Sequence, residues 1–219
     1  MPITMLLAAA AAVGAPATPA PRTAIEAERA FAADARKEGQ WTAFRKWADP
    51  TAVMYTPQAV WAQDWLKDRK DPEVAVRWWP SHSWSSCDAR TAVNIGPRQL
   101  SGATGRFVTL WMRQASGDWR WTADGQLAAK GRFAIPARPI VRRASCSNPR
   151  LRLAVADKLY NQPANRTAPP GDSGYARSAD RSLLFNWTVT ADGTRRTRVQ
   201  LWTGRSFALV LDERTPPGA

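Results

Sequence analysis

The segment GRFVTLWMRQASGDWRWTADGQ at 105–126 decides the fold, because it predicts a β-hairpin. Two runs rich in aromatic and β-branched residues, 106–113 and 119–124, flank Ser116 and Gly117, which are typical turn residues. We expect one face of the hairpin to pack against helices, and it carries Leu110, Met112, Trp119 and Trp121. We expect the other face to be half exposed or to form a subunit contact, and it carries Phe107, Thr109, Trp111, Arg113, Arg120, Thr122 and Asp124.

Upstream of the hairpin, the pattern predicts helices and one short strand. Thr23 followed by Glu26 fits a capping box, so a first helix begins there. Its apolar positions recur at helical spacing, and they are Ala24, Ala27, Phe31 and Ala35. Shorter helices are expected at about 40–47 and 61–67, separated by a strand at 52–56.

Downstream of the hairpin, the sequence predicts more strands and few helices. Residues 81–95, which lie upstream of the hairpin, are also strand-like. Residues 130–152 are rich in Pro and Arg and carry few packing signals, and 162–174 is expected to form a loop. A three-stranded antiparallel meander is predicted at 182–190, 197–203 and 207–212.

The order of these elements resembles the NTF2-like superfamily, which includes SnoaL-like and ketosteroid isomerase-like proteins. The resemblance is carried by residues 24–58, 65–70, 77–97 and 105–126. It implies an α+β fold in which N-terminal helices pack on a curved antiparallel sheet shaped like a cone. Within the superfamily, the chain looks like an uncharacterised group of exported bacterial proteins.

These observations divide the chain into three parts. Residues 1–20 contain an apolar, alanine-rich run before Ala15, Pro16 and Ala17, which is typical of a signal peptide, although a disordered tail is the alternative. Residues 22–126 form the expected NTF2-like domain, and 127–219 form a basic, β-rich C-terminal extension. No segment is apolar enough to predict a membrane span. We therefore expect a periplasmic or secreted protein.

The two cysteines, Cys87 and Cys146, are expected to form a disulfide in such a compartment, and two separate buried thiols are the alternative. One histidine and two cysteines without metal-ligand spacing predict no metal site. The sequence also lacks a phosphate-binding loop and a dinucleotide-binding glycine motif, so we expect no cofactor.

The net charge of +13 is concentrated in the C-terminal part, where residues 126–219 hold 16 basic and 6 acidic residues. Arginine supplies most of this excess and suits contacts with phosphate or carboxylate groups. For an exported protein we expect no nucleic-acid partner, whereas anionic envelope lipid or glycan is a candidate. The alternative is a solvated surface with no specific partner.

Tryptophan supplies the strongest functional signal, with 12 residues in the chain. Seven indoles are candidates to line a pocket for a small hydrophobic ligand, and they are Trp41, Trp47, Trp65, Trp78, Trp84, Trp119 and Trp121. The alternative is that they only fill the core. The resemblance also implies a candidate homodimer contact through the sheet face that carries Phe107 and Trp111.

Three residues are candidates for catalysis, although the sequence leaves open whether the protein is an enzyme. His82 is the only histidine and is flanked by tryptophans, so it is a candidate general base. Tyr55 is a candidate hydrogen-bond donor to an oxyanion, and Asp124 is a candidate carboxylate base. Each of the three has a purely structural alternative. An isomerase- or hydrolase-type enzyme is therefore an alternative to a ligand-binding protein.

Overall fold

The structure, a computed structural model, describes residues 20–129, 138–147 and 171–218. Three helices lie in the N-terminal part, at α1 (Ala24–Lys37), α2 (Gln40–Trp47) and α3 (Ala62–Leu66). The strands of the first sheet are β1 (Ala48–Tyr55), β2 (Ala59–Trp61), β3 (Arg77–Trp78), β4 (His82–Ser85), β5 (Thr91–Leu100), β6 (Ala103–Arg113), β7 (Trp119–Leu127) and β8 (Ile140–Arg143). Those of the second sheet are β9 (Ser173–Arg177), β10 (Leu183–Val189), β11 (Arg195–Trp202) and β12 (Phe207–Thr215).

The first helix forms where the capping pattern predicts it. Thr23 precedes α1, and its hydroxyl accepts the backbone N–H of Glu26 at 3.2 Å. This bond satisfies one of the amide donors that a helix start leaves without a partner. The predicted apolar face is confirmed, since the buried residues of α1 are Ala24, Ala27, Glu28, Phe31, Ala32 and Ala35. Glu28 is the one charged residue in this buried set.

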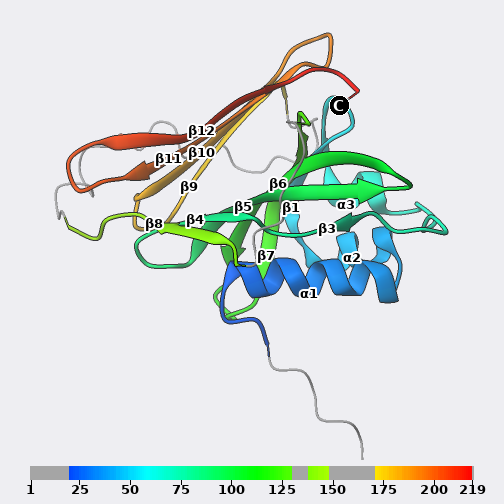
Figure 1. Ribbon diagram of the computed structural model, residues 1–219, viewed down its shortest axis with the longest axis horizontal. Helices are drawn as coiled ribbons and strands as arrows, with labels where there is room; N and C mark the ends of the chain where they lie inside the picture. The colour runs from blue at the N-terminus through cyan, green and yellow to red at the C-terminus, as the bar shows by residue number, and fades with distance from the viewer. Residues whose placement is uncertain (1–19, 130–137, 148–170, 219) are drawn as a thin grey trace, which may run out of the picture.

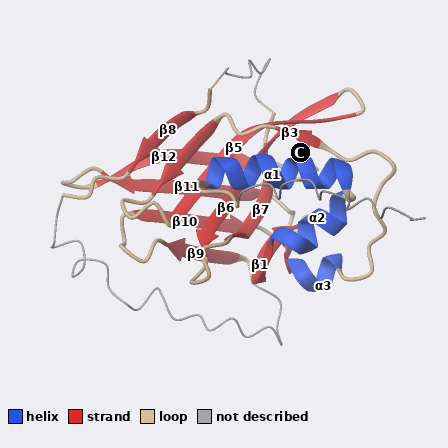
Figure 2. Ribbon diagram, turned by 90° about the horizontal axis from the view of Figure 1, so that it is seen from below, coloured by secondary structure: helices blue, strands red, loops and turns tan. Residues whose placement is uncertain are grey.

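The first sheet is large, curved and mixed, with strand order β2-β1-β7-β6-β5-β4-β8 (Figure 1). The pairs β1–β7 and β4–β8 are parallel, whereas the other pairs are antiparallel. The helices cover one face, and Figure 2 shows all three in front of these strands. The predicted α+β class with helices on a curved sheet is therefore confirmed.

The second sheet is antiparallel, with strand order β12-β11-β10-β9, and lies on the other side of the first sheet (Figure 1). The predicted C-terminal meander is confirmed as β10, β11 and β12. Strand β9 was not predicted, because its residues 173–177 begin within the expected loop at 162–174. Strand β8 comes from the Pro- and Arg-rich stretch and extends the first sheet next to β4. The boundary at residue 126 stays a prediction.

The predicted faces of the β6–β7 hairpin are partly wrong. Leu110 pairs with Ala123, but Trp111 pairs with Trp121, so Thr122 is an extra residue in β7. This bulge breaks the strict alternation that the prediction assumed. As a result, Trp111, Trp119 and Trp121 all pack on the helical side, as does Phe107. Leu110 and Met112 instead pack toward the second sheet.

The same correction bears on the predicted subunit contact. Phe107 is 5% exposed and Trp111 is 0% exposed, because the helices of the same chain cover them. The expectation that these two residues lie on a half-exposed face is therefore wrong. A homodimer through some other surface stays a prediction.

The predicted disulfide is confirmed, and it joins Cys87 and Cys146 across 59 residues. It links the loop after β4 to the segment after β8. The backbone N–H of Cys87 also donates to the hydroxyl of Ser182 at 2.7 Å, which connects this loop to the second sheet. The bond fits an extracellular location. No helix in the described ranges is long and apolar enough to cross a membrane, and the predicted signal peptide lies outside them, except Ala20.

Candidate functional site

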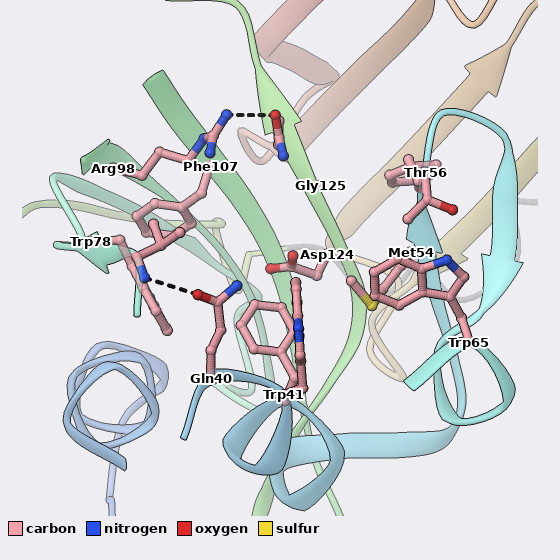
Figure 3. A pocket seen from close by; sticks show the side chains of 14 residues that line it. Gln40, Trp41, Met54, Thr56, Trp65, Trp78, Arg98, Phe107, Asp124 and Gly125 are labelled. Carbon is pink, nitrogen blue, oxygen red and sulfur yellow. Dashed lines mark hydrogen bonds between the residues drawn. The ribbon is translucent and has the colours of Figure 1, made fainter. Parts of the chain in front are cut away.

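A cavity of about 140 Å³ lies between α2, α3 and the helix-facing side of the first sheet (Figure 3). Its apolar lining comes from Trp41, Phe44, Met54, Trp65, Trp78 and Phe107. Its polar lining comes from Gln40, Tyr55, Thr56, Arg98, Asp124 and Gln126. The site therefore combines aromatic walls with a few polar groups, which is the usual composition of a small-molecule pocket.

The aromatic lining is held by edge-to-face contacts. The ring centroids of Trp41 and Trp65 are 5.4 Å apart, and those of Trp41 and Phe44 are also 5.4 Å apart. The guanidinium carbon of Arg69 lies 3.3 Å from the centroid of the Trp65 ring. Such contacts fix ring orientation and add to the energy of burial.

The start of α2 is fixed by an acid from a distant loop. The Asp71 carboxylate accepts the backbone N–H groups of Trp41 and Thr42, and also the Thr42 hydroxyl at 2.6 Å. Gly39 is required here, since a Cβ at that position would lie 2.3 Å from the Asp71 carboxylate. These bonds hold the pKa of Asp71 below its usual range, although partial burial acts in the opposite direction. The cap places Trp41 against the cavity.

Asp124, on β7, supplies an acid at the cavity surface (Figure 3). The Thr109 hydroxyl donates to its carboxylate at 2.8 Å. Protein atoms surround the Asp124 carboxyl group, although part of its surface faces the cavity. Burial raises the pKa of Asp124 to about 8. The nearby Glu28 acts in the same direction, whereas Thr109 and Arg98 oppose the shift. At neutral pH, Asp124 is therefore mostly a neutral acid that can donate a hydrogen bond.

Arg98 supplies a cation beside this acid. Its Nη2 donates to Oε1 of Gln126 at 2.5 Å, and Figure 3 shows this bond at the edge of the cavity. Gly105 lies opposite on β6, and a Cβ there would lie 2.9 Å from the Arg98 Nε. The buried Nε–H of Arg98 has no partner among the described residues. Burial lowers the pKa of Arg98.

Glu28 lies deeper in the same core and was missed by the sequence reasoning. It is 0% exposed, and its carboxylate accepts the indole N–H groups of Trp78 at 2.8 Å and Trp111 at 2.6 Å. The side chain of Asn94 donates to it at 3.2 Å. Burial raises the pKa of Glu28 to about 7, although these three donors act in the opposite direction. The available signal was an acid within the apolar face of the first helix.

The seven candidate tryptophans do not share one cavity. Trp41, Trp65 and Trp78 line it, whereas Trp47 and Trp119 line a second pocket beside Lys46 and Arg120. Trp121 is 0% exposed in the helix-facing core. Trp84 lies on the opposite face of the sheet, in the core shared with the second sheet.

The three candidate catalytic residues are likewise separated. His82 lies beside Trp84, with ring centroids 6.1 Å apart, and does not line the cavity. Its Nδ1 lies 3.0 Å from the Ser81 hydroxyl, and partial burial and the charge of Arg106 lower its pKa. Among the three, Asp124 alone has both a cavity position and a helix-facing side chain.

Tyr55 borders the cavity from β1, but its ring packs toward the second sheet. The ring lies 5.1 Å from that of Trp187 and passes over Gly125, where a Cβ would lie 2.6 Å from its Cδ2 atom. Burial raises the pKa of Tyr55 well above its usual value, and its hydroxyl has no partner among the described residues.

Comparison with known proteins gives a structural neighbour but no family. Neither a family model nor a curated protein matches the sequence. A solved structure from Methylobium petroleophilum PM1, a protein of unknown function with a cystatin-like fold, aligns with 59% of this chain and 98% of its own length. The identity is 15% and the TM-score is 0.35.

Proposed function

We propose that this protein binds a small hydrophobic ligand in the cavity beneath α2 and α3. The observation that carries this proposal is the aromatic cavity itself, with Trp41, Trp65 and Trp78 on its walls. Its volume of about 140 Å³ is close to that of an engineered apolar cavity that takes benzene. The buried part of the ligand is therefore about one aromatic ring in size.

Intrinsic fluorescence and thermal unfolding test this proposal directly. Titration with benzene and phenol should change the tryptophan emission, and the melting temperature should rise with ligand concentration. Trp41→Ala should remove most of the binding, because it opens one wall of the cavity. Trp202→Ala is the matched control, since Trp202 packs against Phe207 on the second sheet. Equal affinities in the two variants would contradict the location.

A second candidate function rests on Asp124. A carboxyl group with a raised pKa at a cavity is suited to proton transfer, so an isomerase- or hydrolase-type reaction keeps Asp124 as its acid or base. Turnover of a ketosteroid or epoxide probe should then be lost in Asp124→Asn and kept in His82→Ala. Loss in His82→Ala alone would contradict this role of Asp124.

The proposal also includes the protein family and the cellular location. The helices on a curved sheet support an NTF2-like protein, and the disulfide supports export to the periplasm or beyond. Cell fractionation checks the location, since the native chain should be found with its disulfide formed outside the cytoplasm. Recovery of the native chain from the cytoplasm alone would contradict export.

A further inference from the structure

Arg98 is a half-buried cation at the cavity with few partners. In the described part of the chain, its side chain makes one hydrogen bond, with Gln126, and forms no ion pair with a carboxylate. Its Nε–H is buried without an acceptor there. A guanidinium stays charged at any physiological pH, so burying it without an anion is costly. The cavity therefore contains an anion-binding group that this part of the protein leaves unpaired.

A second guanidinium adds to the positive potential at this end of the sheet. Arg195, on β11, is 6% exposed, and its Nη2 lies 3.4 Å from the backbone oxygen of Gln126. Its Nε–H also has no partner among the described residues. Burial lowers the pKa of Arg195, and the charge of Arg98 acts in the same direction, whereas Tyr55 opposes it. A bound anion would relieve this repulsion.

We infer that the cavity takes a small aromatic acid, with its ring between the aromatic walls and its carboxylate on the guanidinium of Arg98, which lines the cavity. This inference rests on the proposed binding function and specifies its ligand class. Arginine binds carboxylates through parallel N–H donors, and these charge-assisted bonds are about twice as strong as neutral ones. The cavity volume of about 140 Å³ limits the ligand to one ring and a short acidic group.

Asp124 is compatible with an anionic ligand because it is mostly protonated at neutral pH. The groups that act on it are Thr109 from β6, Glu28 from α1 and Arg98 from β5. Asp124 in turn helps to raise the pKa of Tyr55 on β1. Above pH about 8, Asp124 ionises and repels a carboxylate. The affinity for an aromatic acid should therefore fall as the pH rises past this value, and Asp124→Asn should remove most of the fall.

Three probes of similar size test the inference on the unaltered protein at pH 6.5. They are benzoate, benzamide and benzylamine. Calorimetric titration should show benzoate binding about tenfold or more tightly than benzamide, with benzylamine the weakest. Benzamide binding as tightly as benzoate would overturn the inference and leave the hydrophobic pocket standing. Binding of none of the three, nor of benzene, would overturn the proposed function as well.

Variants then locate the carboxylate contact. Arg98→Gln should reduce benzoate affinity to that of benzamide while leaving benzamide unchanged, and Arg98→Lys should restore part of the loss. Arg198→Gln is the matched control, because Arg198 is exposed and pairs with Asp212 on the second sheet. An unchanged preference for benzoate in a folded Arg98→Gln would place the carboxylate elsewhere and overturn the assignment. The ranking on the unaltered protein decides the ligand class even if this variant fails to fold.

Discussion

The two faces of the first sheet carry cores of different chemistry. The helix-facing core is built from aromatic rings such as Phe31, Trp111 and Trp121, and it also holds the buried acid Glu28 and the cavity. The core between the sheets is richer in aliphatic residues. Its buried acid, Glu213, is paired with Arg106 at 2.6 Å. The helical face therefore carries the cavity of the proposed function, whereas the core between the sheets holds no described cavity residue except Tyr55.

Strand β5 separates the two cores residue by residue. Asn94 faces the helices, where its amide donates to the backbone oxygen of Ala24 at 2.9 Å and to Glu28. Val93 and Ile95 face the second sheet and are buried there. Because side chains alternate along a strand, one segment contributes to both cores.

The comparison predicts the largest stability loss on the face without the cavity. Phe185 is 2% exposed in the core between the sheets, so Phe185→Ala should reduce the free energy of unfolding by about 3–5 kcal/mol. Urea denaturation measures the loss, and benzoate affinity of the folded fraction should stay unchanged. A large loss of affinity would show that the two faces are not independent.

Removal of Glu28, the buried acid on the helical face, should cause the next largest loss of stability. Glu28→Ala leaves two indole N–H groups without their acceptor and removes one of the two acceptors of the Asn94 amide, so the free energy of unfolding should fall by about 2–4 kcal/mol. Glu28→Gln keeps an oxygen acceptor and should lose less than half as much in the same denaturation experiment. Equal losses would mean that burial of the side chain matters more than its hydrogen bonds.

A substitution at Gly125 should affect both faces of the first sheet, and it should lower stability by less than the two variants above. A Cβ there would displace the Tyr55 ring, and such overpacking costs about 1–3 kcal/mol. Because Gly125 and Tyr55 both border the cavity, Gly125→Ala should also weaken binding of benzene and benzoate alike. Gly117→Ala is a weak-contact control at a hairpin turn, although its φ of 94° adds strain. Unchanged ligand binding in Gly125→Ala would show that Tyr55 does not shape the cavity.

Asp124→Asn should have the smallest effect on stability at pH 6, because a protonated acid and an amide are similar in size and polarity. The difference in stability between the variant and the unaltered protein should grow with pH. The pKa of Asp124 is raised from 3.8 to about 8 in the folded chain, so the folded state binds more protons across this range. Its contribution to stability is therefore full below pH about 4 and is lost as the pH rises to about 8.

Denaturation of the unaltered protein and Asp124→Asn from pH 4 to 9 measures this loss. The unaltered protein should lose more stability over the range than the variant. The difference between the two chains cancels the opposite contribution of His82, whose pKa is lowered in the folded state. Parallel profiles would mean that Asp124 titrates normally.

Local sequence patterns predicted the elements better than they predicted the site. The cap of α1 was predictable because Thr23 and Glu26 lie close together in the chain. The faces of the β6–β7 hairpin were not, because the bulge at Thr122 depends on how two strands pair. Strand β8 was missed, since its pairing with β4 is parallel and joins segments far apart in sequence.

The candidate site shows the same limit. Tryptophan content indicated an aromatic cavity, but not that Trp84 would face the other sheet. Arg98 was overlooked because nothing in its local sequence marks it as buried beside Asp124 and Gln126. A lone arginine at a strand end is usually solvated. Arg98 can be recognised as part of the site only when the pairing of β5, β6 and β7 is known.

The bond between Cys87 and Cys146 makes correct assembly depend on the supply of an oxidant. In a cytosol with reducing agents, newly made chain would lack this covalent link between residues 59 positions apart. Recombinant preparation should therefore use an oxidising host compartment or a glutathione redox buffer during renaturation. Reducing additives belong in none of the assay solutions.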